Sequence, residues 1–208
     1  MRALICGSMA YDTIMVFQDR FKNHILPDQV HILNVSFLVP QMRREFGGCA
    51  GNIAYNLKLL GGDPLPMATV GEDFAPYRDW LDKHGIDRRH VTEVPGSYTG
   101  QAFITTDLDD NQITAFHPGA MGSSHLNKVG DAKDVALGIV SPDGRDGMIQ
   151  NALNAQTVFT GRQLWTATFS PWPGGPSRFS AATSRSSSTI WQVSLLRWPS
   201  FSSTLITR

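Results

Sequence analysis

Apolar positions over the first 154 residues form short runs, and each run is followed by a polar turn. Continuous apolar runs of about 4–8 residues are typical of strands buried on both faces of a parallel sheet. Apolar positions three and four residues apart predict amphipathic helices between such strands. The pattern therefore predicts an α/β fold, with buried strands over residues 3–6, 66–70 and 135–140 and helices over 53–60, 75–83 and 144–153.

A second set of predicted strands is less continuously apolar. It covers residues 13–17, 33–38, 99–106 and 112–116. Asp109-Asp110-Asn111 separates the last two strands and predicts a hairpin turn between them. We expect these strands to form a small sheet separate from the parallel one.

The run Gly47-Gly48-Cys49-Ala50-Gly51-Asn52 lies directly before the predicted helix over residues 53–60. Adjacent glycines permit positive φ and close backbone approach, and the free N–H groups of a helix start can face a polar ligand. Asn52 adds a side-chain donor and acceptor. Tight turns and packing use the same residue types, so a ligand-binding turn and a structural turn both remain open.

Ser8 and Asp12 follow the first predicted strand, where α/β sheets bind ligands at the carboxyl ends of their strands. A carboxylate at this place can accept two hydrogen bonds from a vicinal diol. An aspartate after a strand is equally often a turn former.

Ser8, Asp12 and the glycine run together resemble the amino-terminal half of the ribokinase/PfkB superfamily, and within it the bacterial adenosine kinases. The resemblance covers residues 1 to about 154. It extends through residues 37–40, 73–81, 105–107 and 112–121.

This resemblance implies a ribokinase-like parallel sheet flanked by helices, with a β-sheet lid built from residues of about 10–40 and 97–118. It implies transfer of phosphate from ATP, with Mg²⁺, to a sugar or nucleoside hydroxyl, with adenosine converted to AMP as the preferred reaction. It also implies a homodimer formed through the lid.

The resemblance further implies a substrate site. Asp12, Asn52 and the backbone of Gly48 would bind the ribose hydroxyls, and Phe103 and Phe116 would stack on the base. Plain core packing is the alternative role for both aromatic side chains. The implied substrate-binding residues are Ser8, Asp12, Ser36, Gly47, Gly48, Asn52, Phe103 and Phe116.

Charge divides the chain at about residue 154. Residues 1–154 contain all eighteen acidic residues and thirteen basic ones, a net charge of −5. Residues 155–208 lack Asp, Glu and Lys but contain five arginines and four of the five tryptophans. We predict one kinase segment over residues 1–154 and an aberrant, low-complexity, unstructured tail over 155–208.

Two hypotheses would explain this tail: a changed reading frame, or a natural tail domain. A Gly-Ala-Gly-Asp motif in another frame of the coding DNA would support the changed reading frame.

The resembled kinases carry their catalytic base in a Gly-Ala-Gly-Asp motif, and the 208 residues contain no such string. The sequence therefore predicts no catalytic residue and an acceptor-binding half without phosphoryl transfer, with most of the ATP site missing. A non-catalytic nucleoside-binding or dimerisation module and a pseudogene product are the alternatives.

Other residue types exclude several functions. The histidines show no metal-ligand spacing, so no metal site of their own is expected, and Cys6 and Cys49 are expected to be free thiols. The widely spaced arginines of the tail form no nucleic-acid footprint. Without a predicted span or leader peptide, we expect a cytoplasmic protein with neither a nucleic-acid nor a membrane partner.

Overall fold

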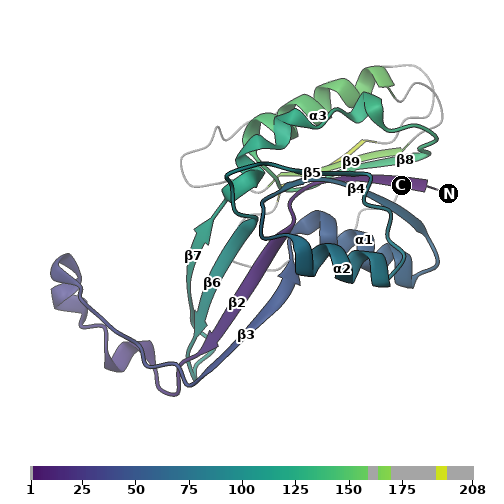
Figure 1. Cartoon of the computed structure of the whole chain (residues 1–208). Helices are drawn as coiled ribbons and strands as arrows, with labels where there is room; N and C mark the ends of the chain where they lie inside the picture. The colour runs from purple at the N-terminus through teal and green to yellow at the C-terminus, as the bar shows by residue number, and fades with distance from the viewer. Residues whose placement is uncertain (1, 159–163, 170–190, 196–208) are drawn as a thin grey trace.

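The computed structural model describes residues 2–158, 164–169 and 191–195, and in this part the chain forms two sheets (Figure 1). The larger sheet has six parallel strands in the order β10-β9-β8-β1-β4-β5. These strands are β1 (Arg2–Cys6), β4 (Asp63–Val70), β5 (His90–Glu93), β8 (Leu137–Val140), β9 (Leu164–Phe169) and β10 (Trp191–Leu195). The predicted α/β class with a parallel sheet is confirmed.

Helices cover the larger sheet on both faces. Helices α1 (Cys49–Leu59) and α2 (Ala75–Lys83) lie on one face (Figure 1). Helix α3 (Arg145–Val158) lies on the other, with the 3-10 segments η3 (Gly119–Leu126) and η4 (Val129–Asp131). Neighbouring side chains of β1 point to opposite faces of the larger sheet and so belong to two separate parts of the core. Leu4 packs towards η4 and α3, whereas Ile5 packs towards α1 and α2.

The smaller sheet contains β2 (Ala10–Val16), β3 (Gln41–Gly47), β6 (Gly100–Thr106) and β7 (Gln112–His117), in the order β3-β2-β6-β7. It extends from the edge of the larger sheet at which β1 ends, as a lid would (Figure 1). The hairpin predicted between β6 and β7 is confirmed, and Asp110 adopts the positive φ that this turn requires.

The strand predicted over residues 33–38 is wrong. These residues form an irregular segment, and the edge strand β3 follows it. Strand β2 already pairs with β3 on one side and with β6 on the other, so no position beside β2 is left for this segment. Strand β3 lies at the edge of the smaller sheet, and most of its side chains are polar and exposed. It therefore lacks the apolar pattern by which buried strands are predicted from a sequence.

A projecting arm, residues 20–40, joins β2 to β3. It contains η1 (Phe21–Asn23) and η2 (Pro27–Ile32), and it reaches away from the rest of the protein beyond the far end of the smaller sheet (Figure 1). Its base is fixed because the rings of Phe17, Phe21 and Phe37 pack against one another with centroids 4.9–5.9 Å apart. The Phe21 N–H also donates to the buried Asp107 carboxylate at 2.9 Å.

The predicted tail over residues 155–208 lies largely outside the described residues. Within it the structure describes the end of α3 and the strands β9 and β10. The division of the chain at residue 154 stays a prediction.

Candidate functional site

The turn into α1 brings the chain close to the end of β1. Gly48 has φ +87°, and a side-chain carbon there would lie 2.6 Å from the Met9 Cα and the Ser8 carbonyl oxygen. A residue with a side chain would clash with this backbone, so position 48 requires glycine. The turn is therefore built for close backbone approach.

Ser8 binds the first amides of α1. Its Oγ accepts a hydrogen bond from the Cys49 N–H at 3.1 Å, and its carbonyl oxygen accepts one from the Ala50 N–H at 2.9 Å. Two of the N–H groups that could have held a phosphate are thus used within the protein. Ser8 positions the turn, and these two amides do not form a phosphate cradle.

Asp12 lies on β2 with its carboxylate directly over Gly47. A side-chain carbon at Gly47 would overlap this carboxylate, so the glycine leaves room for it. Asp12 is half-buried and faces Glu45 across the β2–β3 pair. Burial, and then the charge of Glu45, raise the pKa of Asp12 above its ordinary value. A hydroxyl group of a ligand could donate to this poorly solvated carboxylate.

Asn52 and Ser36 differ in how they relate to this turn. Asn52 lies one helical turn beyond Gly48, and its side chain is exposed near the turn. Ser36 is exposed on the arm, next to Phe37, which packs against Phe17 beyond the far end of β2. Five residues of strand separate Asp12 from Phe17, roughly 17 Å. The structure brings Asn52 to the turn and leaves Ser36 apart from it.

The two predicted base-stacking aromatics do not share a face of the smaller sheet. Phe116 pairs with Ala102, which pairs with Asp12, whereas Phe103 pairs with Thr13 and Ala115. Because neighbouring residues on a strand point to opposite faces, Phe116 lies on the Asp12 face and Phe103 on the other. A clamp formed by both rings is therefore wrong for this structure. The small side chain of Ala102 lies between Asp12 and Phe116 on their shared face.

Asp73 fixes the base of the lid on the face opposite Asp12. Its carboxylate accepts hydrogen bonds from the Thr99 N–H at 2.7 Å and the Gln101 side chain at 3.0 Å, and Arg44 forms an ion pair with it at 3.6 Å. Tyr11 donates its hydroxyl to the Asp73 carbonyl oxygen at 2.9 Å. These contacts join β2, β3 and β6 to the loop after β4 and hold Asp12 in register.

Asp143 is not among the site residues predicted from the sequence. It follows β8, where the Ser8 N–H donates to the Pro142 carbonyl oxygen at 3.0 Å, so it lies beside the end of β1. Burial raises the pKa of Asp143 to about 7. Burial also raises the pKa of Cys49, and the nearby charges of Asp143 and Asp12 raise it further. Two carboxylates therefore flank the start of α1, and a polar residue after a buried parallel strand was the signal for the second.

We searched the described part of the chain for clusters of metal-ligating side chains and for helices that could span a membrane. No group of three or more His, Cys, Asp or Glu side chains there could hold a metal ion. Among the same residues, no helix is both long and apolar enough to span a bilayer.

The arrangement defines an α/β protein with a polar site at the carboxyl end of its parallel strands and a small sheet extending beside that site. Residues 8–149 match the pfkB family of carbohydrate kinases. The chain belongs to this family, and the resemblance of its motifs to the ribokinase/PfkB superfamily is confirmed. Kinases of this family use ATP.

Curated relatives include two archaeal nucleoside kinases. The protein from Methanothermobacter thermautotrophicus is 35% identical over 111 residues, which are 52% of this chain and 36% of that protein. The protein from Methanocaldococcus jannaschii is 36% identical over 89 residues, which are 42% of this chain and 30% of that protein. The matched part is thus about a third of each relative.

Solved structures of two nucleoside kinases are similar to this chain. The nucleoside kinase of Burkholderia thailandensis in complex with inosine is 54% identical with a TM-score of 0.69, and the match covers 79% of this chain and 52% of that one. The M. jannaschii nucleoside kinase has a TM-score of 0.67 at 23% identity, covering 83% and 52%, which supports the fold alone.

Proposed function

We propose that this chain provides the acceptor-binding half of an ATP-dependent nucleoside kinase that prefers adenosine and forms AMP. The observation that carries the proposal is the Asp12 carboxylate, half-buried over Gly47 beside the start of α1. The 54% identity to a kinase solved with inosine supports a purine nucleoside as the ligand class. We place the protein in the cytoplasm, in purine salvage.

In the proposed complex, Asp12 accepts hydrogen bonds from two ribose hydroxyls. Asn52 and the backbone of Gly47 and Gly48 approach the same sugar, and Phe116 stacks on the base. The small side chain of Ala102 leaves room for the ligand between Asp12 and Phe116, which lie on the same face of the smaller sheet. Phe116, and not Phe103, is therefore the aromatic side chain of the lid that we propose for the base. Movement of the lid over the ligand would exclude water from the reacting hydroxyl.

Binding without phosphate transfer is the second part of the proposal. A sugar hydroxyl needs a base to take its proton as it attacks the γ-phosphate of Mg-ATP. The family motif that supplies this base is not among the 208 residues. We expect this chain to bind adenosine and to form no AMP.

Isothermal titration calorimetry with adenosine, inosine, ribose and fructose 6-phosphate tests the ligand class. We expect adenosine to bind most tightly and Asp12→Asn to weaken its binding by about tenfold or more, since a hydrogen bond to a charged group contributes roughly 1.5–3 kcal/mol. Asp79→Asn, on the exposed face of α2, is the control and should bind as the unchanged chain does. Equal affinity in the Asp12 variant would overturn the site, and AMP formation from Mg-ATP would overturn binding without transfer.

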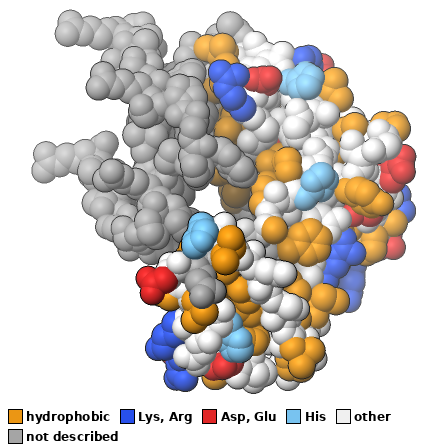
Figure 2. Space-filling model, turned by 90° about the vertical axis from the view of Figure 1, so that its left-hand side faces the viewer, with side chains coloured by type: hydrophobic (Ala, Val, Ile, Leu, Met, Phe, Trp, Pro, Cys, Tyr) orange, Lys and Arg blue, Asp and Glu red, His pale blue; other side chains and the backbone are white. Residues whose placement is uncertain are grey.

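A second candidate function is a module that dimerises through the lid and its arm. Large apolar side chains on the arm are exposed, and on the face shown in Figure 2 apolar side chains lie among charged ones. Exposed apolar side chains gathered on one projecting segment favour a protein partner, and a second copy would cover the same surface on both chains. The exposed apolar residues of the arm are Leu26, Val30, Ile32, Leu33 and Leu38.

A further inference from the structure

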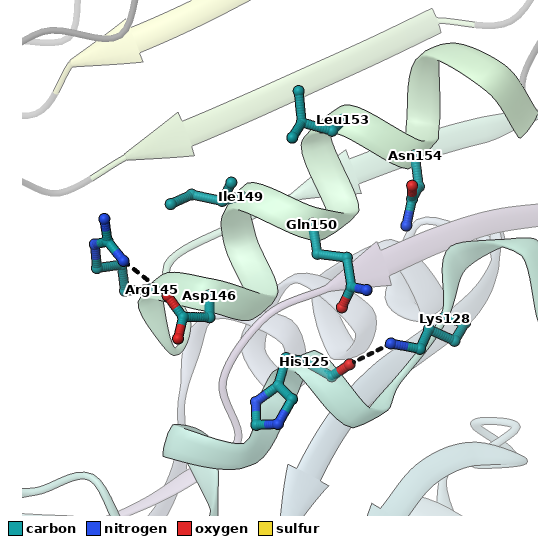
Figure 3. Close-up of a pocket in the computed structure, with 8 residues that line it drawn as sticks. All are labelled: His125, Lys128, Arg145, Asp146, Ile149, Gln150, Leu153 and Asn154. Carbon is teal, nitrogen blue, oxygen red and sulfur yellow. Dashed lines mark hydrogen bonds and ion pairs between the residues drawn. The ribbon is translucent and has the colours of Figure 1, made fainter.

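A groove of about 510 Å³ lies between α3 and the segment that joins η3 to η4 (Figure 3). It belongs to the layer that covers the sheet opposite α1 and α2, so it is separate from the turn at Gly48. Its volume lies within the range of small-molecule sites, roughly 300–1,000 Å³. Its walls include His125, Lys128, Arg145, Ile149, Gln150 and Leu153.

Positive charge lies along the walls of the groove. Lys128 is fixed there because its Nζ donates to the His125 carbonyl oxygen at 2.8 Å, which leaves two ammonium hydrogens for a ligand. Arg145 stands in the first turn of α3, where the helix dipole adds to its charge. Asp146 pairs with Arg145 at 2.8 Å, so an anion would compete with this carboxylate for Arg145 and depend mainly on Lys128.

The groove also contains a hydrogen-bond acceptor without a partner. The Gln150 Oε1 atom is buried and accepts no hydrogen bond from the residues that the structure describes. In Figure 3 the Gln150 side chain points from α3 towards Lys128 and His125. A buried acceptor left unpaired costs about 1–3 kcal/mol, so a ligand that donates an N–H or O–H to this oxygen, once the Gln150 side chain turns it into the groove, recovers that energy.

Ile149 and Leu153 add apolar surface on the same face of α3, one turn apart. The groove thus combines cations, an unsatisfied acceptor and an apolar strip. Inorganic phosphate would use only the cations, and a plain nucleoside would leave them unused. A nucleoside monophosphate offers a phosphate, donor groups on its sugar and base, and a flat apolar ring.

We propose that the groove between α3 and η3–η4 binds a nucleoside 5′-monophosphate. The phosphate pairs with Lys128, the sugar or base donates to Gln150 Oε1, and the ring lies on Ile149 and Leu153. This site is independent of the proposed adenosine site, and its occupation needs no phosphoryl transfer.

Calorimetric titration of the full chain with AMP tests the site, with ribose 5-phosphate, adenosine and inorganic phosphate as comparison ligands. The Asp12→Asn variant serves as the background, so that binding at the turn of Gly48 contributes less to the titration. We expect Lys128→Gln to weaken AMP binding about threefold to tenfold, the range between an exposed ion pair and a charge-assisted hydrogen bond. Asp146→Asn should tighten it, because Arg145 is then released to the phosphate.

Lys133→Gln is the matched control. Lys133 is an exposed lysine whose Nζ donates to a carbonyl oxygen three residues earlier, that of Gly130, at 2.7 Å, as Lys128 does, but it does not line the groove. AMP affinity should be unchanged in this variant, and Gln150→Leu should weaken AMP while leaving inorganic phosphate unaffected. Equal losses in the two lysine variants, no AMP binding, or equal affinity for AMP and inorganic phosphate would each overturn the proposal.

Discussion

Gly47 is the residue on which the position of Asp12 depends most directly. A methyl group at position 47 would overlap the Asp12 carboxylate, so Gly47→Ala must displace either the carboxylate or the turn. Such overpacking costs roughly 1–3 kcal/mol, and we expect a lower midpoint of urea unfolding together with weaker adenosine binding. Gly122→Ala is the control, because a side-chain carbon there meets no atom within 4 Å. Normal adenosine affinity in Gly47→Ala would show that Asp12 can move without loss.

The raised pKa of Asp143 leads us to expect that the free energy of unfolding depends on pH. Its pKa is about 7 in the folded chain and near the ordinary 3.8 in the unfolded chain, so between these values the folded chain binds more protons. Stability contributed by this group therefore falls as pH rises from about 4 to 7. Asp143→Asn keeps an oxygen to accept from the Gly144 N–H and removes the charge. We expect the variant to be more stable than the unchanged chain at pH 8 by roughly 1–3 kcal/mol, with a smaller difference at pH 5. Urea unfolding at both pH values measures this, and equal gains at the two values would contradict it.

At the scale of elements, the buried strands and regular helices could be predicted from the sequence. β1, β4, α2 and the hairpin of β6 and β7 lie where the apolar pattern and turn residues indicated. β3 could not be predicted because an edge strand with exposed side chains has no apolar period. The face of Phe103 depended on strand register, which pattern alone does not specify between distant segments.

The same limit applies to the site. Ser8, Gly48 and Asn52 are close in sequence to elements with clear patterns, and the structure brings them together. The role of Asp143 depends on β8 lying beside β1, a pairing between residues about 135 positions apart. Ser36 lies on an arm whose direction is set by aromatic stacking at its base, and no local pattern describes that contact.

Asp73 links the lid to the larger sheet, so we expect the local stability of the lid to depend on this residue. Asp73→Ala removes the acceptor of the Thr99 N–H and the Gln101 side chain and the partner of Arg44. We expect hydrogen exchange to speed up in β2 and β6, with adenosine binding weakened, while exchange in β1 and β4 changes little. Asp82→Ala, which loses a surface ion pair with Arg88, is the control and should leave exchange in the lid unchanged. Uniform acceleration across both sheets would mean that Asp73 supports the whole fold instead.

At the scale of the whole molecule, the exposed apolar side chains of the arm lead us to predict a dimer. Leu38 is 85% exposed beside the arm's aromatic base, and Leu60 is equally exposed at the end of α1, on the body of the protein. If a second chain covers the arm, Leu38→Glu places a charge in that interface and should convert the dimer to a monomer. Leu60→Glu adds the same charge elsewhere and should leave the dimer intact. Sedimentation equilibrium of the unchanged chain and both variants measures the result. A monomeric unchanged chain, or equal dissociation in both variants, would rule out assembly through the arm.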